Sequence, residues 1–369
     1  MSGSPFDELR LRQYPRAKQG LAWNSADALL VMAARDHSLS SNCVLVVNDE
    51  FGALCVALQG ATLWTDSYLA SLSLKDNLSR NDAAPVQLCW STEDPAKNLS
   101  LASGVTVVMR APKQLAYFEY QLSKLSRTLA PGTTVLVAGM DKHLSPATAE
   151  LMETYIGPTQ RHRGQRKARL FSALRDERQP APYVGDATYY NETLQGELLS
   201  LANGFAREAM DIGSRFLLQN LGLLAPAEKI IDLACGNGII GLTALKKDLG
   251  TSLLLCDESA MAIASARINA HKLFPRRDIS FYHGDGLLHY PGSAADLILC
   301  NPPFHLNHRI DQTVGRRLLV QAAAHLSKGG CLCLVANRHL NYLPVLKREF
   351  KHVHKLAQNS KFIIWQANA

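Results

Sequence analysis

A rigid turn follows a short apolar run near residue 300, and its residue types suit the binding of a planar ligand. The run 295–300 predicts a buried strand, and Asn301-Pro302-Pro303-Phe304 must end it because proline cannot continue a ladder. The turn carries one amide side chain, free carbonyl groups and one aromatic ring. Ligands of open α/β sheets bind outside the carboxyl ends of strands. The pattern therefore indicates a site for an amine-bearing planar ligand, with a simple turn around a packed phenyl ring as the alternative.

A glycine-rich turn joins a predicted strand at 229–234 to a predicted helix. Gly236, Gly238 and Gly241 have the G-x-G-x-x-G spacing of nucleotide-binding turns, in which the backbone approaches a ligand that a Cβ would exclude. Asp257 ends the next predicted strand, where a carboxylate can accept hydrogen bonds from two ribose hydroxyls. This pattern is compatible with a nicotinamide cofactor and with S-adenosylmethionine.

Asp232 distinguishes between these two cofactors. It lies inside the strand that precedes Gly236, where a carboxylate can hold the cationic amino group that S-adenosylmethionine has and NAD lacks. The corner at Asn301 supplies a site for an amine acceptor, and no acid/base pair for hydride transfer is evident. Asp285-Gly286 follows a third predicted strand, where Asp285 is either a turn residue or an acceptor for the adenine amino group. We therefore predict a methyl donor site.

The first half of the chain repeats this alternation of strands and helices. Asp66 ends its second strand as Asp257 does in the second half, and the later strands match in spacing. Residues 48–52 replace the glycine-rich turn, and residues 110–113 replace the corner at Asn301. Alternating strands and helices of these lengths predict a parallel, doubly wound α/β sheet in each half. The first copy keeps the scaffold and lacks both ligand-binding turns.

The predicted domains are a degenerate domain at residues 1–180 and a catalytic domain at 181–369. The segment 144–199 is less regular in pattern than the rest, and 175–186, with two prolines, is typical of a linker. Gly329-Gly330 predicts a turn before the strand 331–336.

The net charge of +7 and a pI of about 9.0 favour an acidic partner, of which nucleic acid is the commonest. The run 161–169 is either a solvated edge or a surface that contacts phosphates. The eight cysteines form no C-x-x-C pair and lie mostly in apolar runs, which favours free thiols in a reducing compartment over disulfides or a metal site. With no long apolar run and no basic-apolar leader, we expect a cytoplasmic protein that contacts no membrane.

Several segments resemble class I methyltransferases that modify exocyclic amines, and most closely the bacterial ribosomal RNA guanine-N2 methyltransferases. These segments start at Asp211, Asp232, Asp257, Asn301 and Val335. Residues 48–54 and 166–170 are most similar to the large-subunit, 23S rRNA enzymes called methyltransferase G, with the small-subunit, 16S rRNA enzymes called methyltransferase C as near relatives. The resemblance implies two tandem class I, Rossmann-like, seven-stranded domains, the first of them degenerate.

The resemblance also implies site residues. The catalytic set is Asn301, Pro302 and Phe304. The S-adenosylmethionine set is Asp211, Gly213, Asp232, Ala234, Gly236, Gly238, Asp257, Glu258, Asp285, Gly286 and Asn301. The RNA-binding set follows instead from the basic run and from a position after a predicted strand, and it is Arg161, Arg163, Arg166, Lys167, Arg169 and Arg338. Asp211 and Gly213 are expected to help close over the cofactor, and Ala234 departs from the glycine of many relatives.

The implied activity is methyl transfer from S-adenosylmethionine to the exocyclic N2 amine of one guanine in 23S rRNA. The 16S rRNA guanine-N2 and the nucleic-acid adenine-N6 methyltransferases remain alternatives, since they share the Asn-Pro-Pro-Phe corner. A non-catalytic rRNA-binding assembly factor is a further alternative, and the basic charge disfavours protein glutamine methylation. His305 and His308 are possible bases or RNA contacts. We expect a monomer without a metal that acts on naked or early-assembly rRNA.

Overall fold

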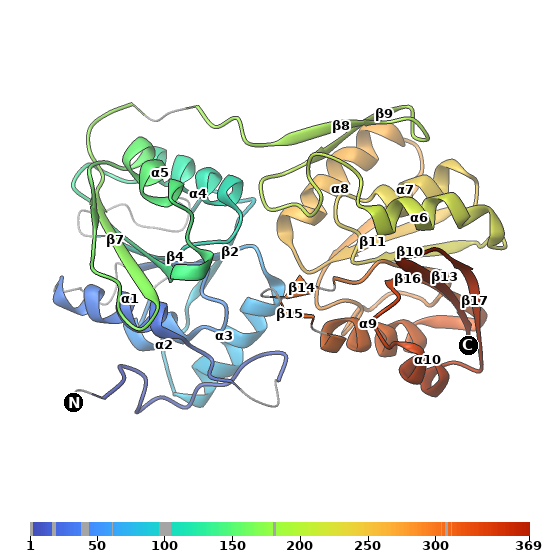
Figure 1. Cartoon of the computed structure of the whole chain (residues 1–369), viewed down its shortest axis with the longest axis horizontal. Helices are drawn as coiled ribbons and strands as arrows, with labels where there is room; N and C mark the ends of the chain where they lie inside the picture. The colour runs from blue at the N-terminus through green and yellow to red at the C-terminus, as the bar shows by residue number, and fades with distance from the viewer. Residues whose placement is uncertain are drawn as a thin grey trace. The chain divides into compact units, whose positions relative to one another are not determined.

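The computed structural model describes residues 3–16, 20–37, 44–60, 62–95, 105–179, 182–303, 305–306, 309–310 and 312–369. The chain divides into two compact units, Met1–Gly185 and Asp186–Ala369, and each is considered by itself (Figure 1). No helix within the described ranges is both long enough and apolar enough to cross a membrane.

The first unit is built on a seven-stranded sheet with the order β3-β2-β1-β4-β5-β7-β6. Helices α1, α2 and α3 pack against one face and α4 and α5 against the other. The elements are α1 (Ser25–Asp36), β1 (Val44–Val47), α2 (Ala53–Leu58), β2 (Thr62–Thr65), α3 (Tyr68–Arg80), β3 (Gln87–Trp90), β4 (Thr106–Arg110), α4 (Leu115–Thr128), β5 (Thr134–Met140), the 3-10 helix η2 (Asp141–His143), α5 (Ala147–Tyr155), β6 (Thr159–Arg161) and β7 (Ala168–Leu174).

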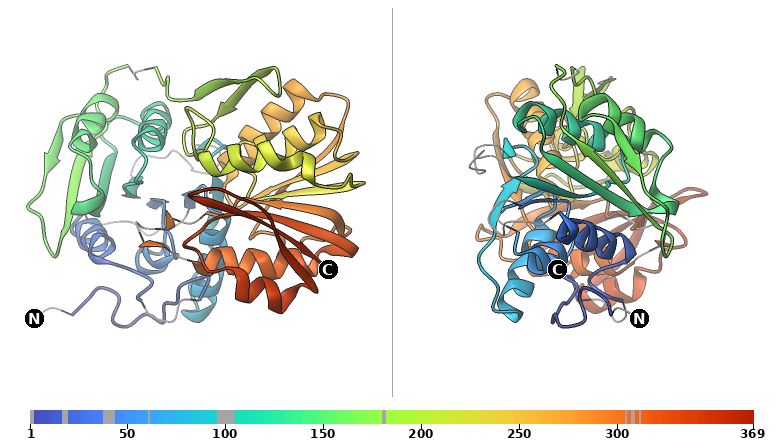
Figure 2. Two further views of the ribbon diagram at one scale, coloured as in Figure 1. Left: turned by 45° about the vertical axis from the view of Figure 1, so that its right-hand side comes forward. Right: turned by 90° about the vertical axis from the view of Figure 1, so that its left-hand side faces the viewer.

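The second unit repeats this sheet with the order β12-β11-β10-β13-β16-β18-β17, after a hairpin of β8 and β9. Figure 2 shows α6, α7 and α8 over one face and α9 and α10 over the other, and the two apolar clusters have the same division. The elements are β8 (Ala187–Asn191), β9 (Gly196–Ser200), α6 (Ile212–Asn220), η3 (Leu221–Leu223), β10 (Lys229–Leu233), α7 (Ile239–Lys246), β11 (Ser252–Asp257), α8 (Ala260–Leu273), β12 (Asp278–His283), β13 (Ala295–Cys300), β14 (His305–Leu306), β15 (Arg309–Ile310), α9 (Gln312–Ala324), β16 (Leu326–Asn337), α10 (Leu343–Glu349), β17 (His352–Gln358) and β18 (Phe362–Asn368).

The predicted pair of Rossmann-like, seven-stranded domains is confirmed, but the prediction of wholly parallel sheets was wrong. In the second unit β18 runs antiparallel to β16 and β17. In the first unit β7 runs antiparallel to β5 and β6. The reason is local: a short turn joins the last two strands of each unit, and a short turn can connect only antiparallel strands.

Three further predictions from composition differ from the structure. Gly329-Gly330, predicted to form a turn before a strand, lies within β16, where the pairing with β13 shifts register and Gly329 has φ +83°. Glycine inside a strand is typical of such a bulge. Arg175, predicted to begin a linker, is buried in the first unit, and its Nε donates to the Ser126 carbonyl at 2.8 Å. The segment 144–199, predicted to be less regular, contains α5 and the hairpins β6–β7 and β8–β9.

The turn after β10 contains an alanine in a backbone conformation that favours glycine. Ala234 has φ +64°, and Asn48, the first residue of the corresponding turn in the first unit, has φ +60°. Asparagine tolerates this left-handed region, whereas an alanine Cβ crowds the following carbonyl oxygen. The departure noted in the sequence therefore falls on a strained position.

We predict that Ala234→Gly raises the free energy of unfolding by up to about 1 kcal/mol, because relief of strain at positive φ outweighs the greater chain entropy of glycine. Urea denaturation followed by circular dichroism measures the change. Ala234→Val is expected to destabilise, since a β-branched residue is poorly tolerated at positive φ. A less stable glycine variant would contradict the assignment of strain.

Candidate active site

The two turns singled out in the sequence leave the sheet beside each other. Strands β10 and β13 are parallel neighbours, with Leu233 opposite Cys300 in the register. The turn that begins at Ala234 and the corner that begins at Asn301 therefore start at adjacent carboxyl ends. This is the point where the strand order reverses, which is the usual ligand position in doubly wound sheets.

Asp232 is a buried carboxylate, and only one of its two oxygens accepts a hydrogen bond. Its side chain has no exposed surface, and its Oδ2 accepts the Gly241 N–H at 2.8 Å. Its Oδ1 is buried with no hydrogen-bond partner among the described residues. Burial raises the pKa of Asp232 to about 7, against the lowering effect of the Gly241 N–H, and the charge of Asp257 raises it further. A cationic group beside Oδ1 would satisfy this atom and stabilise its charge.

The glycine-rich turn leaves open space at Gly236, four residues after Asp232. Gly236 has φ +54°, and a Cβ on it would meet nothing within 4 Å. Gly241 is needed for packing instead, because a Cβ there would lie 2.9 Å from the Leu253 side chain. Asp257 accepts the Gly236 N–H at 2.9 Å and the Ser259 N–H at 3.0 Å. An unsatisfied acid beside an open turn fits the amino-acid end of S-adenosylmethionine.

The remaining residues of the predicted cofactor set lie at the ends of neighbouring strands. Gly238 caps α7 with φ +86°, and the Glu258 carbonyl lies 2.9 Å from His283 Nε2. Asp285 and Gly286 are buried after β12. Within the described ranges no group of three His, Cys, Asp or Glu side chains is arranged to hold a metal ion.

Arg317 is a residue of this region that the sequence pattern did not reveal. It lies on α9 and forms an ion pair with the buried carboxylate of Asp285. The two residues are 32 positions apart, and neither helix periodicity nor a motif connects them. Packing of α9 against the sheet brings them together, so the pair becomes evident only in the tertiary structure.

The Asn301 amide is held by the segment before β10. Its Nδ2 donates to Asp211 Oδ2 at 3.1 Å and to Ser214 Oγ at 3.0 Å. Asp211 is also the N-cap of α6, since the same oxygen accepts the Ser214 N–H at 3.0 Å. Gly213 lies between them, where a Cβ would be 3.5 Å from Asn301 Oδ1.

Other predicted residues of the corner are only partly described. Pro302 is buried directly after Asn301. Phe304 and His308 lie outside the described residues, and only the backbone of His305 is described, at the start of β14. Their predicted roles stay predictions.

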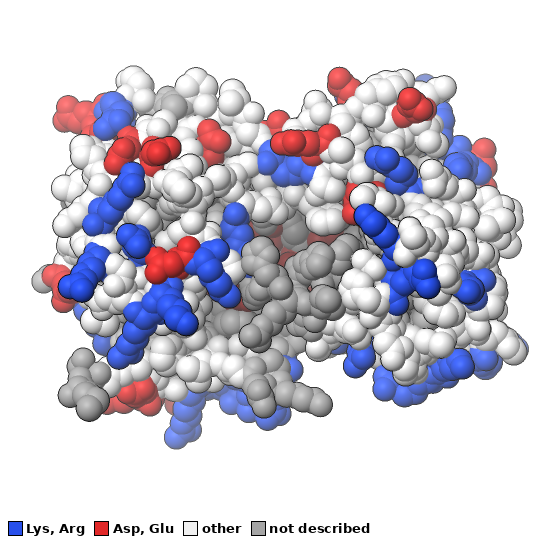
Figure 3. All heavy atoms as spheres, in the orientation of Figure 1, with Lys and Arg blue, Asp and Glu red and all other residues white. Residues whose placement is uncertain are grey.

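The predicted RNA-binding residues are divided between the two units. Five of them belong to the hairpin of β6 and β7 in the first unit, and Arg338 follows β16 in the second. Arg161, Arg163, Arg166 and Lys167 are exposed, and Arg169 lies 3.3 Å from Asp141. Figure 3 shows Lys and Arg atoms gathered on the face of the first unit that carries this hairpin.

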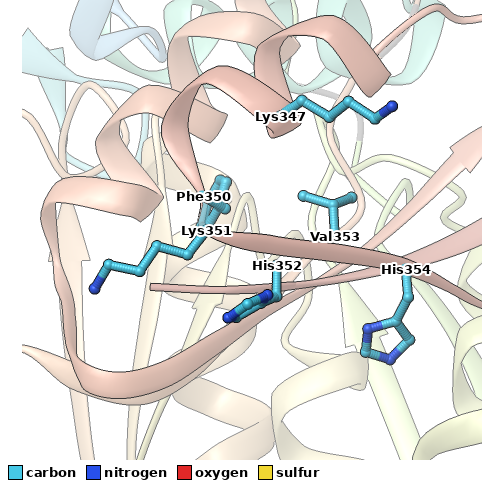
Figure 4. Close-up of a pocket in the computed structure, with 6 residues that line it drawn as sticks. All are labelled: Lys347, Phe350, Lys351, His352, Val353 and His354. Atoms are coloured by element: carbon cyan, nitrogen blue, oxygen red, sulfur yellow. The ribbon is translucent and has the colours of Figure 1, made fainter.

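A pocket of about 570 Å³ lies away from the carboxyl ends of the strands (Figure 4). It is lined by Lys347, Phe350, Lys351, His352, Val353 and His354. His352 pairs with Asn368 at the end of β18, whereas Phe362, at the start of β18, pairs with Asn337 at the carboxyl end of β16. The pocket therefore lies at the amino ends of the parallel strands, whereas Asp232 and Asn301 lie towards their carboxyl ends.

The first unit fills the corresponding region with its own side chains. Arg110 ends β4 as the corner residues follow β13, and its guanidinium forms an ion pair with Asp27 of α1. Burial raises the pKa of Asp49 to about 6, against the lowering effects of the Cys55 N–H and, to a smaller extent, of Arg110. The Asn48 amide pairs with Gln121 at 2.8 and 2.9 Å. An internal ion pair thus occupies the strand end at which the second unit presents Asn301, and Val46 lies at the position of Asp232.

Comparison with known proteins agrees with this duplication. Family models match the RLMG N-terminal domain over residues 2–177 and the methyltransferase small domain over residues 195–366. The 16S rRNA N2 methyltransferase of T. thermophilus, solved with AdoMet and guanosine, has a TM-score of 0.77 over 94% of this chain and 92% of that one. At 19% identity this similarity supports the fold alone.

Closer relatives match over nearly their whole length. Proteins called ribosomal RNA large subunit methyltransferase G in Alcanivorax borkumensis and Stutzerimonas stutzeri are each 39% identical to this chain. The alignments cover 98% of this chain and 95% and 97% of those relatives. A third, from Pseudomonas aeruginosa, is 38% identical over 99% of the chain. The resemblance inferred from the motifs is confirmed: this chain belongs to the ribosomal RNA large subunit methyltransferase G family.

Proposed function

We propose that this chain transfers a methyl group from S-adenosylmethionine to the N2 amine of one guanine in 23S rRNA. Membership of the large-subunit family supports the substrate, and the unsatisfied carboxylate of Asp232 beside an open glycine turn carries the cofactor assignment. When bound, this cofactor supplies an electrophilic methyl group on a sulfonium. The reaction is proposed to take place in the cytoplasm, on naked or early-assembly RNA.

Three carboxylates hold the cofactor in this proposal. Asp232 faces the cationic amino group, Asp257 accepts from the ribose hydroxyls, and Asp285 accepts from the adenine amine. The position of Asp257 after β11 and of Asp285 after β12 supports this division, because the two strands are adjacent in the sheet. Asp285 is held in place by Arg317, which leaves its carboxylate little freedom to turn.

Asn301 and Pro302 orient the guanine amine. The lone pair of an exocyclic amine is delocalised into the ring, so positioning is a cheaper route to reaction than deprotonation. Asn301 Oδ1 and the Pro302 carbonyl accept the two N–H bonds, which directs the lone pair out of the base plane. Phe304 stacks on the base, a contact worth roughly 1–3 kcal/mol. Correct orientation alone lowers the barrier by up to about 7–11 kcal/mol.

The hairpin of β6 and β7 is the proposed phosphate contact of the first unit. Arg166 and Lys167 form its two-residue turn with φ +47° and +62°, between Gln165 and Ala168, which exchange hydrogen bonds of 2.8 and 2.9 Å. A turn with two positive φ values favours Asn-Gly. Two exposed cations in these positions violate the local preference, which is typical of residues retained for function. We propose that the first unit recognises RNA and the second catalyses.

Asn301→Ala is expected to abolish methyl transfer, because the acceptor of the substrate amine is removed. Asn301 also belongs to the predicted cofactor set, but the three carboxylates remain, so cofactor affinity should stay within about twofold. Incorporation of labelled methyl into 23S rRNA, together with calorimetry of cofactor binding, measures both. Digestion of the wild-type product to nucleosides must yield N2-methylguanosine; N6-methyladenosine would contradict the proposal. Near wild-type turnover of the variant would disprove the role of Asn301.

Cofactor affinity is expected to increase with pH. The pKa of Asp232 is raised to about 7, so the carboxyl is largely neutral at pH 6 and binds an ammonium group poorly until it ionises. The dissociation constant should fall roughly fivefold to tenfold between about pH 6 and pH 7.5, with proton release on binding near the lower end. Asp232→Asn should bind weakly with a flat profile over this range. A flat profile in the wild-type protein would contradict the prediction.

Arg166→Asn with Lys167→Gly removes two charges and installs the preferred turn, so the hairpin is expected to become more stable while rRNA affinity falls. The slope of log affinity against log salt should decrease by about 1–2 units, since each lost phosphate contact removes about 0.7–0.9. Binding to protein-free 23S rRNA at several salt concentrations provides the measurement. Lys347→Gln with Lys351→Gln, an equal loss of charge in the second unit, is the control. Equal effects of the two pairs would rule out a specific role for the hairpin.

A further inference from the structure

One carboxylate oxygen of Asp211 connects the start of α6 to the corner after β13. Oδ2 accepts the Ser214 N–H at 3.0 Å and Asn301 Nδ2 at 3.1 Å. The second hydrogen of the Asn301 amide points to Ser214 Oγ at 3.0 Å. Asp211 and Asn301 are 90 positions apart in the chain, so only the fold brings them together.

The chemistry of the carboxylate determines which way the Asn301 amide faces. An amide side chain can present its oxygen or its NH2 to a neighbour, and a hydroxyl such as that of Ser214 accepts either choice. An ionised carboxylate has no hydrogen to donate, so it accepts only the NH2. The Asn301 oxygen is therefore directed away from Asp211.

We propose that Asp211 is a positioning residue for the methyl transfer, which it serves by fixing the orientation of the Asn301 amide. This inference rests on the proposed role of Asn301 as acceptor of the substrate amine. With the amide turned over, an NH2 group would face the substrate amine, and two donors cannot form a hydrogen bond with each other. The carboxylate thus determines whether the corner binds the amine or repels it.

Two neighbouring observations agree with this role. Gly213 follows Asp211 closely, and a Cβ on it would lie 3.0 Å from Asp211 Oδ2 and 3.2 Å from the Phe362 ring. The contact between Asp211 and Asn301 thus lies where a larger residue would disturb it. In the first unit the corresponding connection is the ion pair of Asp27 on α1 with Arg110 at the end of β4. Both units join their first helix to the fourth strand through an acid, but only the second presents an amide.

The family resemblance implies a different role for Asp211, in which it helps close over the cofactor. The two roles predict different measurements. A residue that holds the cofactor changes the cofactor dissociation constant, and saturating cofactor restores turnover. A residue that orients Asn301 changes turnover at saturating cofactor and leaves the dissociation constant unchanged.

Asp211→Ser tests the inference. Serine caps a helix about as well as aspartate does, so α6 and the thermal midpoint should be preserved. Its side chain is too short to reach Asn301, so the orientation of the Asn301 amide is no longer determined. We expect turnover on 23S rRNA at saturating cofactor to fall roughly tenfold to a hundredfold, the effect of losing a hydrogen bond to a charged group. The cofactor dissociation constant, measured by calorimetry, should stay within about twofold.

Three further variants make each outcome decisive. Asp211→Asn is the conservative variant: the oxygen that caps α6 is the one that accepts from Asn301, so an asparagine cap still holds the amide and should restore most of the turnover. Ser214→Ala leaves the carboxylate in place and should lose less than about threefold, since Asp211 alone fixes the amide. Asn301→Ala is the reference. If Asn301→Ala is inactive while Asp211→Ser is fully active, or if the loss in Asp211→Ser is only in cofactor affinity, the inference is overturned. If Asn301→Ala is itself active, the proposed function of the corner fails first.

Discussion

Asp232 lies in the middle of the second unit without exposed surface, and a carboxylate in that position is costly to ionise unless a cation faces it. One of its oxygens is satisfied by the start of α7 and the other has no partner among the described residues. The neighbouring residue Asp257 is itself an acid and raises the pKa of Asp232 further. The negative charge of Asp232 is therefore left to be compensated by a ligand. The cationic amino group of the cofactor would supply this compensating charge. The corner at Asn301, which is proposed to bind the substrate, follows the adjacent strand.

The comparison of the two units shows how the same scaffold can exist without a buried acid that needs a cationic ligand. Both keep a buried asparagine that clamps the turn: Asn77 donates to the Phe51 carbonyl at 2.7 Å and Asn269 to the Asn237 carbonyl at 3.0 Å. In the first unit, however, Val46 lies at the position of Asp232, and Arg110, at the position of Asn301, pairs with Asp27. That ion pair forms without a ligand. A few residues at two turns therefore separate a unit that binds a cofactor from one that we propose to bind RNA.

The substrate corner depends on a contact between distant segments. Asn301 is presented by the end of β13, but the direction of its amide is set by Asp211 at the start of α6. The rigid proline turn fixes where the Asn301 amide lies, and the Asp211 carboxylate fixes that its oxygen, not its NH2 group, faces the substrate. Guanine binding and cofactor binding thus rely on separate polar groups at adjacent strand ends, which explains how one sheet edge accommodates two ligands.

The sequence by itself determined the features that depend on neighbouring residues. Apolar runs predicted β10, β11 and β13, the glycine spacing predicted the turn after β10, and Ala234 was correctly singled out as an unusual residue there. The edge strand β17 was not predicted from the sequence, because a strand at a solvated edge needs no apolar run. Its polar residues, among them His352, His354 and Lys355, give no strand pattern that the sequence alone would reveal. The bulge at Gly329 and the ion pair of Arg317 with Asp285 also depend on partners remote in the chain. Which atoms of Asp232 and Asn301 remain available to ligands was decided only by the tertiary structure, because hydrogen-bond satisfaction depends on what packs against each side chain.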